Sequence, residues 1–252
     1  MTPLDHSAAV AAETARFVGA VRAADPATPV PTTPGWTLAD LVQHAGSVQR
    51  WFTVLLRQRI QARPTSRDVD LKLPGRAEAF PDWLADAAAE AGGAFAATDL
   101  DAPMWAWGAD QHARFWVRRM LFETLVHRVD AELALGGKAD IAPELAADGV
   151  DEFLTNLPYA AFFAPGTAEL RAEDRTIRFA RTDGDGTWLV RLRPDGFGLD
   201  RDAAHVPADA TVSATAADLL LLLYGRVDRA SEGVAVAGDE ALLALWFANS
   251  AF

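Results

Sequence analysis

The chain has 252 residues, of which 50% are hydrophobic and 23% charged, so it is long enough for one large globular domain or two small ones. Its net charge of −12 argues against a nucleic-acid partner, which needs a basic surface, and against an anionic membrane. No apolar run approaches the ~20 residues that span a bilayer, and the N-terminus lacks the pattern of a secretory signal, so we expect a cytoplasmic protein.

The chain contains no cysteine. Disulfides, thiolate metal sites and an internal thiol nucleophile are therefore excluded. Any bound metal has to use imidazole, carboxylate, carbonyl or water ligands. Any sulfur chemistry has to use a thiol that comes from outside the chain.

The first half of the sequence predicts four long amphipathic helices, in which apolar residues recur every three or four positions. They are expected at about 5–24, 38–62, 81–97 and 113–135. The second follows a proline-rich loop and starts with Thr37 as N-cap and Asp40 at the third helical position, a variant of the capping box. Four such helices with modest connections predict a four-helix bundle. A fifth helix is expected from Pro143 to about Leu157.

The pattern changes after about Gly166, where charged and apolar residues alternate between the turn sequences DGDG and PDG. This alternation predicts a solvated antiparallel sheet. Two later segments, ATVSATAADLLLLLYGR and GVAVAGDEALLALWFA, each predict a strand followed by a helix. The sequence therefore predicts an α+β protein of two domains, with a helical, metal-binding bundle over 1–160 and a small α+β domain over 161–252.

Two of the predicted helices place metal-ligand side chains on apolar faces. Residues four apart share one face of a helix, so Glu123 and His127 lie in a stripe with Trp116, Met120 and Ala131. His44 lies in a second stripe, with Leu41, Val48, Phe52 and Leu55. A carboxylate in such a stripe must be paired, protonated or metal-bound, because an isolated buried charge is very unfavourable. Two imidazoles and one carboxylate on facing helices would form a divalent metal site with room for an exogenous ligand.

The residues by themselves leave a second interpretation open. Glu and His at this spacing also form simple ion pairs, and a core histidine is more often hydrogen-bonded than metal-bound. Three other histidines are expected to be structural or exposed: His6, His112 and His205. Of these, His6 lies on the first helix, from which it could approach the same end of the bundle.

PTTPGWTLADLVQHAGSV and RFWVRRMLFETLVHRVDAELALG resemble two motifs of the mycothiol-dependent maleylpyruvate isomerase-like proteins of the DinB superfamily. LLLLLYGR and AGDEALLAL resemble their C-terminal domain, which has a sterol-carrier-like α+β fold. The resemblance implies a zinc ion, or another divalent metal, on His44, Glu123 and His127. It also implies mycothiol as the thiol cofactor, which adds to the cis double bond of maleylpyruvate and leaves after rotation to give fumarylpyruvate.

The resemblance also suggests roles for residues around this site. Arg226 resembles an arginine that faces the bundle in the family, so we expect it to orient an anionic substrate. The alternative is a solvated cation near a helix end. Asp130 is expected either to accept a proton from a ligand imidazole or to form a salt bridge with an arginine. Surface ion pairs are expected for Arg119 and for Arg128, the latter with Glu132.

The tryptophans of the loop before the fourth helix, Trp105 and Trp107, are expected either to wall the pocket or to pack as lids. The functional prediction is a zinc-dependent enzyme that uses a low-molecular-weight thiol for isomerisation or S-transfer on a small anionic substrate. Two alternatives are a metal-binding regulator without turnover and a zinc hydrolase that needs no thiol. The expected partner is a small molecule, with neither nucleic acid nor membrane involved, and the sequence sets no oligomeric state.

Overall fold

The computed structural model describes residues 4–64, 69–202 and 206–251, and the chain divides into two compact units, Met1–Ala139 and Asp140–Phe252. The division lies earlier than the boundary at residue 160 that the sequence suggests. The reason is the fifth helix, α5 (Pro143–Asn156), which packs against α6 (Ala216–Leu223) of the second unit. The ring of Phe153 on α5 lies 5.0 Å from that of Tyr224, just after α6. The buried face of α5 is thus covered by its own unit.

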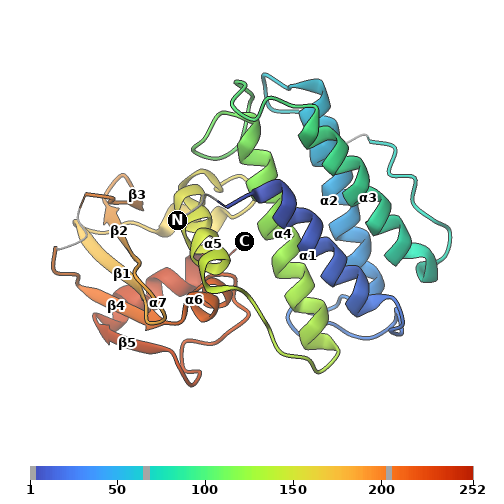
Figure 1. The fold of residues 1–252 in the computed structure, drawn as a ribbon. Helices are drawn as coiled ribbons and strands as arrows, with labels where there is room; N and C mark the ends of the chain where they lie inside the picture. Colours follow the sequence, from blue (N-terminus) through green and yellow to red (C-terminus); the bar gives the residue numbers. More distant parts are fainter. Residues whose placement is uncertain (1–3, 65–68, 203–205, 252) are drawn as a thin grey trace. The chain divides into compact units, whose positions relative to one another are not determined.

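The first unit is a four-helix bundle, as the sequence predicts (Figure 1). It consists of α1 (His6–Val21), α2 (Leu38–Gln58), α3 (Phe80–Ala96) and α4 (Ala113–Ala134). Helices α1 and α2 each pack on both α3 and α4, so each of the four helices has two neighbours in the bundle. Helix α2 ends before the expected residue 62, because Arg59 takes a left-handed conformation with φ 47° and stops the helix. No helix of the described residues is long and apolar enough to cross a membrane.

The start of α2 is fixed by local sequence. The predicted capping box is present: Thr37 Oγ1 accepts from the Asp40 backbone N–H at 3.3 Å, and the Asp40 carboxylate accepts from the Thr37 N–H at 2.9 Å. A turn precedes it, with Gly35 at φ 89° and a hydrogen bond of 3.0 Å from the Trp36 N–H to the Thr33 carbonyl. These are the features of a type II turn with Pro at its first central position and Gly at its second. The turn places Trp36 directly beside the start of α2.

The second unit contains a five-stranded sheet in the order β3-β2-β1-β4-β5. The strands are β1 (Arg175–Arg181), β2 (Thr187–Arg193), β3 (Gly196–Leu199), β4 (Ala210–Ala214) and β5 (Ala235–Gly238). The two strand-to-helix segments form as predicted, with α6 after β4 and α7 (Glu240–Asn249) after β5, and Asp239 caps α7 by accepting from the Leu242 N–H at 3.0 Å.

The sheet is mixed, whereas the sequence predicts an antiparallel one. Strands β1, β2 and β3 pair antiparallel across the DGDG and PDG turns, as expected. Strand β4 pairs parallel with β1, with Phe179 opposite Val212. A tight turn forces the strands that it joins to run antiparallel, but β4 is reached by a longer connection, which leaves its direction free.

Helices α2 and α3 approach each other closely at Gly46. A methyl group at this position would lie 2.2 Å from the ring of Trp83 on α3. Trp83 is 4% exposed and is held in place by its Nε1–H, which donates to the Leu71 carbonyl at 2.8 Å, and by the Arg50 guanidinium 5.2 Å from the ring centre. Gly46 therefore sets the packing of α2 two residues after His44.

We predict that Gly46→Ala lowers the free energy of unfolding by about 1–3 kcal/mol or more, because the new methyl group overlaps a ring that cannot move away. Gly92→Ala is the control: Gly92 lies in the interior of α3 with nothing near its Cβ position, so alanine there should stabilise by roughly 0.5–1 kcal/mol. Urea denaturation of both variants measures the difference. Equal stability of the two variants would contradict the tight contact.

Candidate metal centre

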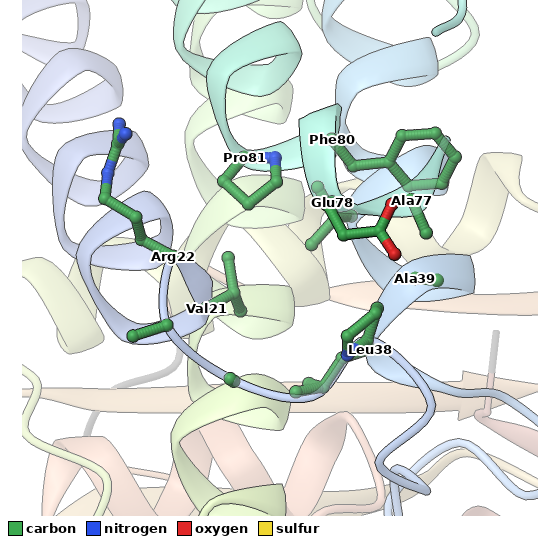
Figure 2. A pocket seen from close by; sticks show the side chains of 12 residues that line it. Val21, Arg22, Leu38, Ala39, Ala77, Glu78, Phe80 and Pro81 are labelled. Carbon is green, nitrogen blue, oxygen red and sulfur yellow. The ribbon is translucent and has the colours of Figure 1, made fainter. Parts of the chain in front are cut away.

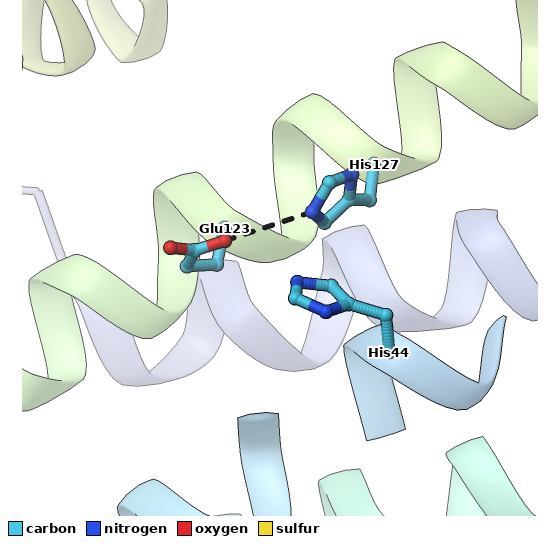
Figure 3. Close-up of side chains that lie close together, drawn as sticks. All are labelled: His44, Glu123 and His127. Carbon is cyan, nitrogen blue, oxygen red and sulfur yellow. Dashed lines mark ion pairs between the residues drawn. The ribbon is translucent and has the colours of Figure 1, made fainter. Parts of the chain in front are cut away.

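The three residues that the sequence predicts as metal ligands come together in the bundle (Figure 3). His44 projects from α2, and Glu123 and His127 project from α4, so that one potential ligand atom of each lies within 4.8 Å of the others. Glu123 Oε2 lies 3.7 Å from His127 Nε2, and the two imidazole rings meet edge to face with their centres 4.8 Å apart. Metal binding at this cluster, here called the His-Glu-His cluster, stays a prediction.

The chemistry of the cluster fits a zinc ion. Imidazole nitrogen and carboxylate oxygen are typical zinc ligands, and three protein ligands are characteristic of zinc sites that keep one position open. Bonds of about 2.0–2.1 Å to a shared ion bring donor atoms to within roughly 4 Å of one another, so a small side-chain rotation would complete the site. His127 is 8% exposed, whereas the Glu123 side chain is 28% exposed. A small molecule can therefore reach the cluster from the Glu123 side.

Asp130 holds His127 from the side opposite the cluster. Its Oδ2 lies 2.9 Å from His127 Nδ1, and the carboxylate is completely buried. Because a buried carboxylate is a strong acceptor, this contact favours the tautomer with the proton on Nδ1 and leaves the Nε2 lone pair to face Glu123 and His44. Of the two roles that the sequence suggests for Asp130, the geometry supports contact with the imidazole.

Arg119 forms a longer ion pair with Glu123. Its Nε lies 3.6 Å from Glu123 Oε1, while the other carboxylate oxygen faces His127. The expectation of a surface ion pair is wrong for Arg119, because only 1% of this residue is exposed. The Glu123 carboxylate therefore lies between a buried guanidinium and the His127 imidazole.

Arg128 is also buried rather than on the surface. The predicted pair with Glu132 is present at 2.6 Å, but Arg128 has no exposed surface and also donates through Nε to Glu13 on α1 at 2.9 Å. Helix α1 covers this face of α4, and its Glu13 supplies a second carboxylate partner from outside α4. The arginine thus joins two helices instead of binding a ligand.

Trp36 is a neighbour of the cluster that the sequence analysis did not identify. Its ring centre lies 5.1 Å from that of His44 and 6.3 Å from that of His127, nearly stacked on the latter. The indole therefore covers part of both imidazoles. The sequence feature that could have identified Trp36 is its position in the same motif as His44, directly after the Pro-Gly turn.

An open hollow of about 470 Å³ lies beside His44. It is lined by the end of the loop before α2 and by one face of α2: Gly35, Trp36, Asp40, Gln43, His44 and Ser47. A second, smaller pocket of about 170 Å³ lies between the end of α1 and the starts of α2 and α3 (Figure 2). Apolar side chains such as Val21, Leu38 and Phe80 line it, and it includes no member of the His-Glu-His cluster.

The other histidines that the structure describes and the two loop tryptophans are not members of the His-Glu-His cluster. His112 contacts Asp110 at 2.5 Å and, like His6 at the start of α1, is not part of the cluster, and His205 lies outside the described residues. Trp105 accepts a hydrogen bond of 2.9 Å from Trp116 through its carbonyl, and the Trp107 ring lies 5.2 Å from that of Phe115. Both therefore pack on the start of α4.

Arg226 follows α6 in the second unit, where it donates to the Tyr224 carbonyl at 2.6 Å. This local hydrogen bond holds the guanidinium near the end of the helix. A role in substrate binding stays a prediction.

Comparison with known proteins assigns both units to one family of enzymes. The mycothiol maleylpyruvate isomerase N-terminal domain matches residues 7–132, and the C-terminal domain of the same family matches residues 144–245. The chain therefore belongs to the mycothiol maleylpyruvate isomerase family, as the sequence motifs suggest.

Two solved structures share the fold: the mycothiol-dependent maleylpyruvate isomerase and a histidine-to-alanine mutant of it. Each aligns with a TM-score of 0.63 and 15% sequence identity over 92% of both chains. At this identity the likeness shows the fold alone. No curated protein matches the chain in sequence.

We predict that Asp130→Asn lowers the affinity for zinc about 10- to 100-fold, because an amide is a weaker acceptor and no longer fixes the His127 tautomer. Competition with a chromogenic chelator measures the affinity, and circular dichroism checks that the fold is retained. Asp86→Asn, an exposed position on α3, is the matched control and should leave the affinity unchanged. A folded Asp130→Asn protein with wild-type zinc affinity would refute the role of Asp130.

Proposed function

We propose that this protein is a zinc-dependent enzyme that uses mycothiol, or a similar low-molecular-weight thiol, to isomerise a small anionic substrate such as maleylpyruvate. The observation that carries the proposal is the His-Glu-His cluster, which lies beside an open hollow. Membership of the mycothiol maleylpyruvate isomerase family supports it. The lack of cysteine is consistent with a nucleophile that comes from a cofactor.

Each residue of the centre has a distinct role in this proposal. His44, Glu123 and His127 would hold the metal, which when bound would lower the pKa of a thiol so that it reacts as a thiolate at neutral pH. Asp130 keeps the His127 Nε2 lone pair directed into the cluster, and Arg119 forms an ion pair with Glu123. Trp36 limits access of water to the two imidazoles.

In the proposed reaction, the covalent bonds form and break between the thiol and the substrate, and no side chain of the protein takes part in them. The thiolate sulfur forms a bond to one alkene carbon, and the displaced electron pair moves into the adjacent carbonyl group as an enolate. The resulting carbon–carbon single bond rotates, and the electron pair then returns as the sulfur leaves, so no atoms are gained or lost. We propose that Arg226 orients a substrate carboxylate during these steps, because its planar guanidinium matches that group.

Transfer of the thiol to the substrate, without its departure, is the closest alternative and uses the same residues. A metal-binding regulator is less well supported, because a purely structural zinc site is normally closed by four protein ligands, whereas the described cluster offers three. A zinc hydrolase would use the same cluster but would need no thiol.

Calorimetry separates these functions. Mycothiol titrated into zinc-loaded protein should release heat, and zinc-free protein should give much less, because the thiol sulfur binds the metal. Glu123→Gln should lower both the zinc content and the heat. Glu78→Gln, an exposed position near α3, serves as control and should change neither. Absence of binding at millimolar mycothiol to the zinc-loaded protein would exclude a thiol-using enzyme and favour the hydrolase or the regulator.

A further inference from the structure

The hollow beside His44 gathers polar groups on one face of α2. Asp40, Gln43, His44 and Ser47 occupy positions i, i+3, i+4 and i+7 of the helix, so their side chains line up next to one another. Trp36 lies one turn earlier and contacts His44. The volume of about 470 Å³ falls within the roughly 300–1,000 Å³ of pockets that hold whole small molecules.

Several of these groups are available for hydrogen bonds. In the part of the chain that the structure describes, the Gln43 side-chain amide and the Trp36 indole N–H make none. The Ser47 hydroxyl donates to the Gln43 carbonyl at 2.6 Å, which leaves its oxygen free to accept. Asp40 uses Oδ2 for the capping box, and its Oδ1 remains available as an acceptor. The hollow therefore offers both donors and acceptors.

The charge of the hollow disfavours an anionic ligand. Its lining contains no lysine or arginine, and the Asp40 carboxylate is exposed. Hydrogen bonds from the Thr37 hydroxyl and the Thr37 backbone N–H hold the pKa of Asp40 below its ordinary value, so this group is negative at neutral pH. A second carboxylate placed here would be repelled, so we expect the anionic substrate to bind on another side of His44.

Hydroxyl groups match the hollow better than a cation does. An ammonium group can only donate, so it could pair with Asp40 but not with the Trp36 N–H or the Gln43 amide N–H groups. A hydroxyl group both donates to Asp40 Oδ1 and accepts from Trp36 or Gln43. A sugar-like ring also has apolar C–H faces that pack on an indole while its hydroxyls reach the polar groups around it.

We propose that this hollow is the binding subsite for a neutral polyol, namely the sugar part of the thiol cofactor, and that it holds the cofactor with its sulfur toward the His-Glu-His cluster. The inference rests on the proposed use of a thiol. It adds that Trp36, Asp40 and Gln43 select a thiol that carries a carbohydrate over a simple thiol of the same reactivity.

The test compares two neutral thiols on zinc-loaded protein by calorimetry: mycothiol, and N-acetylcysteine amide as a thiol without a sugar part. The wild-type protein should bind mycothiol at least about tenfold more tightly, through two or more added hydrogen bonds. Gln43→Ala should weaken mycothiol binding about three- to tenfold and leave N-acetylcysteine amide binding unchanged. Gln58→Ala, an exposed glutamine at the end of the same helix, should alter neither.

The outcomes separate the subsite from the function. Equal affinity of the wild-type protein for the two thiols, or an equal loss for both in Gln43→Ala, overturns the polyol subsite and leaves a thiol-using enzyme in place. Binding of neither thiol overturns the proposed function and the subsite together. Because alanine favours helix formation, Gln43→Ala is expected to fold normally.

Discussion

Helix α4 carries charged side chains through the interior of the bundle, and each of them has to be paired there. Arg128 and Asp130 are completely buried, and Arg119 is nearly so. Burying a charge without a partner is very unfavourable, so the bundle is stable only in an arrangement that provides every partner. Arg119 forms an ion pair with the candidate ligand Glu123, and Asp130 contacts the candidate ligand His127. Contacts that pair the buried charges of α4 therefore also involve the residues of the site.

A hydrogen-bonded contact fixes where α2 lies relative to α4. The Gln49 side-chain amide donates to Thr14 on α1 at 2.9 Å and to Thr124 on α4 at 3.0 Å. Thr124 is next to Glu123, so the distance from α2 to α4 is set close to the cluster. This contact, together with the close approach of α2 to α3 at Gly46, brings His44 within reach of Glu123 and His127.

The features that the sequence predicts well are those that depend on neighbours along the chain. The capping box of Thr37 and Asp40 needs four residues, and the stripe that contains Glu123 and His127 needs only the helical period. That His44 meets this stripe was expected from the family resemblance, which supplies information on tertiary structure that a single helix does not contain.

The features that the sequence does not predict depend on partners far away in the chain. Arg128 is expected on the surface until α1 brings Glu13 to it. Trp36 looks like an ordinary loop residue until the turn at Gly35 places its ring on the imidazoles. Strand β4 has no tight turn to set its direction, and its parallel pairing with β1 follows from the fold of the whole unit.

The coordination of zinc tests the central claim most directly. X-ray absorption spectra of the zinc-loaded protein should show two imidazole nitrogens and one carboxylate oxygen at about 2.0–2.1 Å, with a further ligand from solvent. The addition of mycothiol should replace that solvent ligand by sulfur at about 2.3 Å. A spectrum with one imidazole or none, or a protein that binds no zinc, would contradict a shared metal on His44, Glu123 and His127.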